Sequence, residues 1–333
     1  MDSRRDDSPP SIPLRREIRF VTTMARRHVA AARTLLIGVL TACAACGGTT
    51  STGGQPTAPS QLAAPVIEVN GSITDTLTGA SIGAFSGSTQ SFPLLTRVEA
   101  PGYLSRDVYV TSSTPTVDLI PESALTYYRN LVRDGFDHPE SMQSKVLRRW
   151  STSPSVYIRT IDDMGKRVDG ANLDVVVQAL GIIEEVSGGQ LAMAGYEMGT
   201  DTREGARGWI TVKWGQPSDD RCGIAQIGVS GGWIELNPGP RCTCSPGAGI
   251  VPRTVRHEFA HALGFFHTGE RGDLLSGLPW SCTDRNATLS VKERTHLAIA
   301  FKRVPGNRDI DADPRPTTAL AAPGGSPSIV VVD

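Results

Sequence analysis

The sequence lacks an excess of charge of either sign. Its 333 residues include 33 Lys and Arg and 34 Asp and Glu, so the formal net charge is −1. Without a basic excess there is no reason to expect nucleic acid or an anionic membrane surface as a partner. The length suits about two domains, and an apolar content of 39% is typical of globular proteins. Nothing in the composition indicates an oligomeric state.

Cysteine is scarce, with six residues in the whole chain. Four of them lie in its second half and can form two disulfides if the protein is exported, whereas a cytosolic chain would keep them as buried thiols. Cys242 and Cys244 are too close in sequence to favour pairing with each other. Each is therefore expected to pair with Cys222 or Cys282, in an order that the sequence does not determine.

The N-terminal region has the features of an export signal. Residues 25–33 are basic, and residues 34–40 form a short apolar run that is followed by small residues. This order is typical of a secretory signal peptide, and the apolar run is too short to span a bilayer as a helix. Residues 1–46 are therefore predicted to be a signal region. Residues 47–65, rich in Gly, Ser, Thr and Pro, are predicted to be a flexible linker.

The end of this signal region, Leu40-Thr41-Ala42-Cys43, resembles the bacterial lipobox. In a lipobox the cysteine is lipidated and becomes the new N-terminus. The resemblance implies that Cys43 carries a lipid anchor in a membrane, with lipidation of Cys46 and plain secretion as the alternatives. Either route takes the protein out of the cytoplasm, where an oxidising compartment favours disulfides.

Residues 66–120 alternate apolar and polar side chains, with Gly and Pro at short intervals. This pattern is typical of a small all-β sandwich. The turns at Asn70-Gly71, Thr78-Gly79 and Ala100-Pro101-Gly102-Tyr103 resemble those of carboxypeptidase regulatory-like domains. That resemblance implies a spacer or interaction domain without catalytic residues. Residues 121–149, with a helix from Pro121 to about residue 132, are predicted to be a helical connector.

The remaining pattern mixes strands and helices, so the whole fold is predicted to be α+β. A catalytic domain is expected over residues 150–305, and residues 306–333 are expected to form a disordered tail whose acidic residues are solvated. Ser290 and Glu293 are spaced as a capping box at the start of a helix that reaches about residue 302. The other elements expected in this domain are strands over 155–160, 190–198, 208–214 and 232–236 and a helix over 170–186.

Three of the six histidines fall in one pattern. His257 and His261 are four residues apart on a helix that Pro252 can begin, so both project from the same face. Gly264 is placed to end this helix in a left-handed turn, which lets His267 approach the same ion. Three protein ligands leave a fourth position for water, as in catalytic zinc sites. The sequence therefore predicts one Zn²⁺ bound by these three histidines.

Glu258, next to the first of these histidines, is not expected to bind the metal. Zinc lowers the pKa of a coordinated water to about 7 and polarises a scissile carbonyl. Glu258 is expected to take a proton from that water and to pass it later to the leaving amine. The pattern therefore predicts hydrolysis of peptide bonds, with a protein or peptide as substrate.

The segment from His257 to His267 resembles the metzincin metallopeptidases, whose motif is His-Glu-x-x-His-x-x-Gly-x-x-His. The resemblance implies a five-stranded sheet whose edge strand binds substrate, an active-site helix, and a methionine-containing turn beneath the zinc. By analogy, residues 232–236 would be the edge strand. Leu275 stands where the family has its methionine, and leucine supplies a similar volume.

Two other functions stay open at this point. In one, the chain is a surface lipoprotein whose sandwich is a binding module and whose zinc domain is catalytically silent. The presence of Glu258 argues against it, because a silent scaffold needs no base. In the other, the zinc is structural and a cysteine is its fourth ligand, which disulfides at all four downstream cysteines would exclude.

Overall fold

The computed structural model describes residues 64–216, 221–245, 248–279, 281–285 and 288–316 and the backbone of 328–329. The predicted signal region, nearly all of the linker and the predicted lipidation site Cys43 lie outside these residues. Among the helices within them, none is both long enough and apolar enough to cross a bilayer. The fold is α+β, as predicted.

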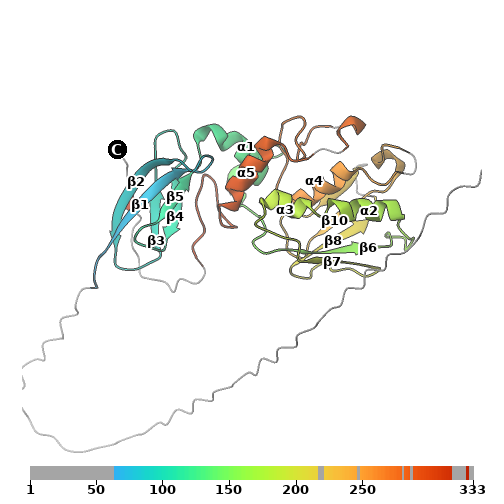
Figure 1. The fold of residues 1–333 in the computed structure, drawn as a ribbon, viewed down its shortest axis with the longest axis horizontal. Coiled ribbons are helices and arrows are strands. Elements are labelled where there is room, and N and C mark those ends of the chain that lie inside the picture. The colour runs from blue at the N-terminus through green and yellow to red at the C-terminus, as the bar shows by residue number, and fades with distance from the viewer. Residues whose placement is uncertain are drawn as a thin grey trace, which may run out of the picture. The chain divides into compact units, whose positions relative to one another are not determined.

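The N-terminal part of the described chain consists of strands in two small sheets (Figure 1). Alternate side chains of the strands point inwards, and Val69, Ile73, Phe85, Val98, Val110, Val117 and Leu119 form a small core. The first sheet has the order β2-β1-β5, from β1 (Ile67–Asp75), β2 (Ser81–Thr89) and β5 (Thr116–Leu119). The second has the order β11-β3-β4, from β3 (Leu94–Val98), β4 (Arg106–Val110) and β11 (Ser328–Ile329).

A five-stranded sheet organises the rest of the chain, with the order β7-β6-β8-β10-β9. Its strands are β6 (Ser155–Arg159), β7 (Gly195–Gly199), β8 (Trp209–Trp214), β9 (Gly223–Ala225) and β10 (Trp233–Leu236). Four strands are parallel, and β9 alone runs antiparallel to its neighbour β10. Helices α2 (Gly170–Ala179), α3 (Ile182–Ser187) and α4 (Pro252–Ala262) lie over one face of this sheet (Figure 1).

The predicted edge strand is wrong. Residues 233–236 form β10, which lies inside the sheet because β9 covers its outer side. Strand β9 was not predicted, because three residues are too few to show the alternation that marks a strand. The predicted helix over 170–186 is also wrong, because it is two helices separated at Leu180 and Gly181. Glycine in a helix interior is unfavourable, which fits a break there.

The segment predicted to be a connector belongs to the core of the five-stranded part. It contains 3-10 turns at Glu122–Ala124 and Met142–Ser144 and helix α1 (Leu125–Arg133). Tyr128, Leu131 and Val132 of α1 are almost fully buried in the same hydrophobic cluster as the sheet and α4. The predicted domain boundary at residue 150 therefore does not coincide with a boundary in packing.

Helix α5 (Val291–Phe301) begins as predicted. Ser290 Oγ accepts a hydrogen bond from the Glu293 backbone N–H at 3.0 Å, and the Glu293 carboxylate accepts one from the Ser290 N–H at 2.7 Å. This capping box satisfies two donors at the start of the helix. The remaining short helical turns are Pro240–Cys242 and Cys282–Asp284.

The prediction of a disordered tail from residue 306 is wrong for residues 306–316. Arg303, whose side chain is fully buried, pairs with Asp311 at 2.8 Å and with Asp118 of β5 at 2.6 Å. Asp309 and Asp313 pair with Arg129 and Arg106. These aspartates are not a solvated run, because their side chains are buried and each of them pairs with an arginine.

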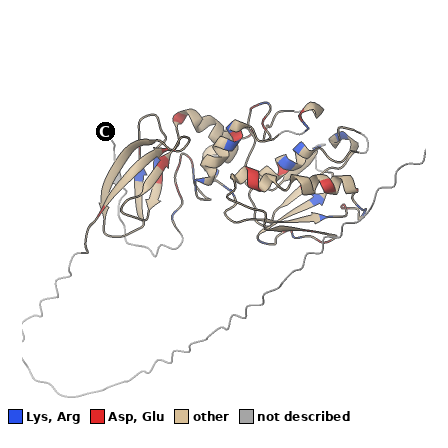
Figure 2. Ribbon diagram, viewed as in Figure 1, with Lys and Arg blue, Asp and Glu red and all other residues tan. Residues whose placement is uncertain are grey.

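Charged residues outside the Arg303 cluster are of both signs. Acidic and basic residues are interspersed over the helices and strands of the described chain (Figure 2), in keeping with the net charge of −1. Several form exposed pairs such as Lys292 with Glu270 and Arg203 with Glu197. Exposed pairs of this kind contribute little to stability compared with the buried pairs around Arg303.

Candidate metal centre

Helix α4 carries the first two histidines. It begins at Pro252, which suits a first helical position because proline has no N–H to leave unpaired. Val255 and Phe259 are fully buried and fix the helix on the sheet. His257 and His261 then lie one turn apart on the same side, and His261 is only 6% exposed.

The chain reverses at Gly264, just after α4. Its φ of +116° is a conformation that residues with a Cβ rarely adopt. A Cβ there would also lie 2.7 Å from the carbonyl carbon and oxygen of Arg148. Only glycine meets both conditions, and the turn brings His267 back to the other two histidines, as the sequence predicted.

The three imidazole rings meet at their Nε2 atoms. The distances between these atoms are 2.9 Å for His257 and His261, 3.1 Å for His261 and His267, and 3.2 Å for His257 and His267. The three histidines are therefore grouped closely enough to hold one metal ion.

The Nδ1 atoms show which nitrogens are protonated. Nδ1 of His257 lies 2.8 Å from the Leu274 carbonyl oxygen, and Nδ1 of His261 lies 2.7 Å from the Phe265 carbonyl oxygen. A carbonyl oxygen only accepts, so each Nδ1 must donate and each Nε2 is left with a lone pair. Nδ1 of His267 lies 2.6 Å from the Asp137 carboxylate, which likewise accepts when ionised.

Three lone pairs converging at about 3 Å repel one another unless a cation lies between them. Protons do not easily supply that charge. Burial lowers the pKa of His257 to about 4, and burial lowers the pKa of His261 well below its usual range. The rings of His257 and His261 are therefore neutral at neutral pH, the state in which imidazole binds a metal. This arrangement fits a metal ion.

Glu258 lies beside the triad and is only 5% exposed. Burial raises the pKa of its carboxyl to about 8, and the positive charge of Arg221 lowers it to a lesser extent. The carboxylate is packed against the edge strand β9. A Cβ added to Gly223 would lie 2.6 Å from both Cγ and Oε1 of Glu258, so glycine at this position is what leaves room for it.

No family model and no curated protein matches the chain.

The turn after His267 contacts the metal centre, because its Leu274 carbonyl accepts the hydrogen bond from His257. Leu275, which stands at the position of the family's methionine, is fully buried. The Glu293 carboxylate accepts hydrogen bonds from the backbone N–H groups of Leu274 at 3.0 Å and Leu275 at 2.7 Å. Glu293 thus fixes the peptide whose carbonyl holds His257. The sequence showed Glu293 as a capping residue but gave no sign of this second contact.

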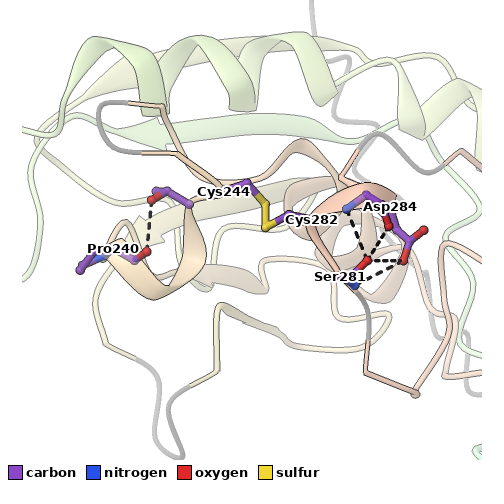
Figure 3. The surroundings of a disulfide bond; sticks show 7 residues. Pro240, Cys244, Ser281, Cys282 and Asp284 are labelled. Atoms are coloured by element: carbon purple, nitrogen blue, oxygen red, sulfur yellow. Dashed lines mark hydrogen bonds between the residues drawn. A yellow bond between two sulfur atoms is a disulfide. The ribbon is translucent and has the colours of Figure 1, made fainter.

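The four downstream cysteines form two disulfides, Cys222–Cys242 and Cys244–Cys282. This pairing is one of the two orders that the sequence allowed. The first bond joins Cys222, just before β9, to Cys242. The Cys242 carbonyl accepts a hydrogen bond from the N–H of Val251, the residue before α4, so the bond connects β9 to the start of this helix. In the second bond, Cys282 is at the start of a helical turn capped by Ser281 and Asp284 (Figure 3).

The disulfides have two consequences. They indicate an oxidising, extracellular type of environment, in line with the predicted export. They also leave none of these four cysteines with a thiolate, so none of them can be a metal ligand while the bonds are intact.

Proposed function

We propose that this chain is an exported zinc-dependent peptidase. The observation that carries the proposal is the convergence of three imidazole Nε2 atoms, with the buried carboxyl group of Glu258 next to His257 in the sequence. The disulfides support export, and a lipid anchor at Cys43 is part of the same proposal.

Zinc is the ion that suits these ligands best. Calcium and magnesium prefer oxygen ligands, whereas imidazole nitrogen suits zinc and its transition-metal neighbours. Each ring also donates its other N–H to a carbonyl or carboxylate, as is usual around zinc. When bound, zinc lowers the pKa of a water molecule to about 7 and polarises a substrate carbonyl. His257, His261 and His267 would hold it.

Glu258 is proposed as the general base and acid. Glu258 follows His257 on α4 and its carboxyl is buried, and burial raises its pKa to about 8, so that it can accept and return a proton near neutral pH. Oε1 takes the proton of the attacking water and delivers it to the nitrogen of the leaving amine. Peptide hydrolysis needs both transfers, and one carboxyl in this place supplies both.

Strand β9 is proposed to bind the substrate main chain. It is the outermost strand of the sheet, and only β10 pairs with it in the described part of the chain. An extended peptide can add to such an edge by main-chain hydrogen bonds. Because Gly223 of β9 contacts Glu258, a peptide bound there would lie close to the base. A five-stranded sheet with one antiparallel edge strand supports the metzincin resemblance.

The proposal is tested by metal content and cleavage together. We expect the purified protein to contain about one zinc per chain and to cleave a mixture of denatured proteins. Removing the metal with a chelator should abolish cleavage, and Zn²⁺, but not Ca²⁺ or Mg²⁺, should restore it. Cleavage that survives complete zinc removal would contradict the proposal. Bound zinc without cleavage would favour the silent zinc domain of a binding lipoprotein.

Replacing Gly223 by alanine is expected to lower kcat/KM for peptide hydrolysis by roughly 100-fold, because the added Cβ displaces the Glu258 carboxylate by about an ångström. The zinc content should not change, since Glu258 is not a ligand. Gly87→Ala is the matched control: it also adds a methyl group to a strand glycine, but one with open space around it. Equal activities of the two variants would show that the contact between Gly223 and Glu258 is unimportant.

A further inference from the structure

A segment far upstream of the histidine motif lies against the metal centre. It follows helix α1, which ends at Asp134 in a left-handed conformation with φ +62°. The ring of Phe136 then lies against two glycines beside His267: a Cβ added to Gly269 or Gly277 would be 2.9 Å or 2.6 Å from it. The segment is held at its start by an ion pair of 3.2 Å between Asp134 and Lys145.

This packing brings Asp137 to His267. Oδ2 of Asp137 lies 2.6 Å from Nδ1 of the ring, although the two residues are 130 positions apart in the sequence. His257 and His261 differ from His267, since both are on helix α4 and their Nδ1 atoms donate to backbone carbonyls of nearby turns. His267 is outside the helix, its side chain is 31% exposed, and its Nδ1 donates to a side chain.

His267, which is outside the helix, thus donates to a carboxylate, whereas His257 and His261 donate to backbone carbonyls. A charge-assisted hydrogen bond to a carboxylate is roughly twice as strong as one between neutral groups. It also fixes the ring orientation and the tautomer, so that Nε2 carries the lone pair and points to the other two rings. A carboxylate partner further increases the electron density that the ring offers to a metal ion.

We propose that Asp137 is a positioning residue of the metal centre, which orients His267 and is needed for tight zinc binding. This inference rests on the proposed zinc site. It also means that residues preceding position 150 complete the site, through the Phe136 packing and the Asp137 hydrogen bond.

The test compares Asp137→Ala with Asp137→Glu and with the control Glu140→Gln in the full chain. The control removes an exposed carboxylate from the same segment and leaves the ion pair between Asp134 and Lys145 in place. Zinc affinity is measured by competition with a chromophoric chelator. The tautomers of the metal-free histidines are read from their ¹⁵N chemical shifts, which a general loosening of the fold would not change for His267 alone.

We expect Asp137→Ala to weaken zinc binding by roughly 10–100-fold and to leave His267 in a mixture of tautomers. Asp137→Glu should recover part of the affinity, and Glu140→Gln should bind zinc as the wild type does. An affinity of Asp137→Ala within twofold of wild type would overturn this inference and leave the proposed function standing. If the wild type binds no zinc, the proposed function and this inference both fail.

Discussion

Glu258→Gln is expected to lower kcat/KM for peptide hydrolysis by roughly 10²–10⁴-fold while the protein keeps about one zinc per chain. Glutamine has nearly the shape of a protonated glutamate. It fits the same space against Gly223, and it leaves the three imidazole ligands in place. What it cannot do is accept a proton. The variant therefore separates the loss of the base from any loss of the metal.

The measurement pairs steady-state cleavage of a quenched-fluorescence peptide with zinc analysis of the same sample. Glu235→Gln is the matched control, because Glu235 is a partly buried carboxylate on the same domain that pairs with Lys213 at 3.2 Å. It should retain activity within about threefold, as a substitution away from the reacting groups. Cleavage by Glu258→Gln at the control's rate would exclude Glu258 as the base.

Gly264→Ala is expected to destabilise the protein by about 2–5 kcal/mol and to weaken zinc binding. Part of this, about 1–2 kcal/mol, is the strain of a left-handed conformation for a residue with a Cβ. The rest comes from the clash at 2.7 Å with the Arg148 carbonyl group. Because Arg148 backbone atoms cannot move aside cheaply, the turn must shift, and His267 shifts with it.

The control for this variant is Gly79→Ala in the sandwich, where φ is +72° and nothing lies near the added Cβ. It should cost only the conformational strain, about 1–2 kcal/mol, and should bind zinc with unchanged affinity. Urea denaturation gives the two stabilities and chelator competition gives the two affinities. If both variants lose stability equally and bind zinc equally, the close approach of Gly264 to Arg148 has no role in placing His267.

The parts of the centre that the sequence predicted are local in the chain. His257 and His261 are related by helical spacing, and Gly264 by the need for a turn before His267. The capping box at Ser290 is a pattern of the same kind, with its two residues three positions apart. In each case the contact is made by residues that the backbone geometry of one element brings together.

The parts that it missed depend on the tertiary fold. Asp137 meets His267 across 130 positions, and no spacing rule connects a residue of one turn to a residue of another. Gly223 contacts Glu258 only because β9 joins the sheet edge beside α4. Glu293 was identified as a helix cap, and its contacts with Leu274 and Leu275 follow from where α5 packs.

The packing of helix α1 and residues 306–316 could not be predicted for a related reason. Residues 306–316 have the polar, Pro- and Asp-containing composition of a tail, and helix α1 is a short amphipathic helix between two predicted domains. Their burial depends on partners elsewhere: Arg303 and Arg106 for the tail, and the core of the five-stranded part for α1. Composition cannot show that an aspartate such as Asp311 meets a buried arginine.

The central claim is that three histidines and no other protein group hold one zinc ion, with a position left for water. The zinc K-edge X-ray absorption spectrum of the oxidised, zinc-loaded protein tests it most directly. The account predicts three imidazole nitrogens and one oxygen at about 2.0–2.1 Å, with no sulfur. A sulfur shell near 2.3 Å, or a fourth imidazole in place of the oxygen, would contradict it.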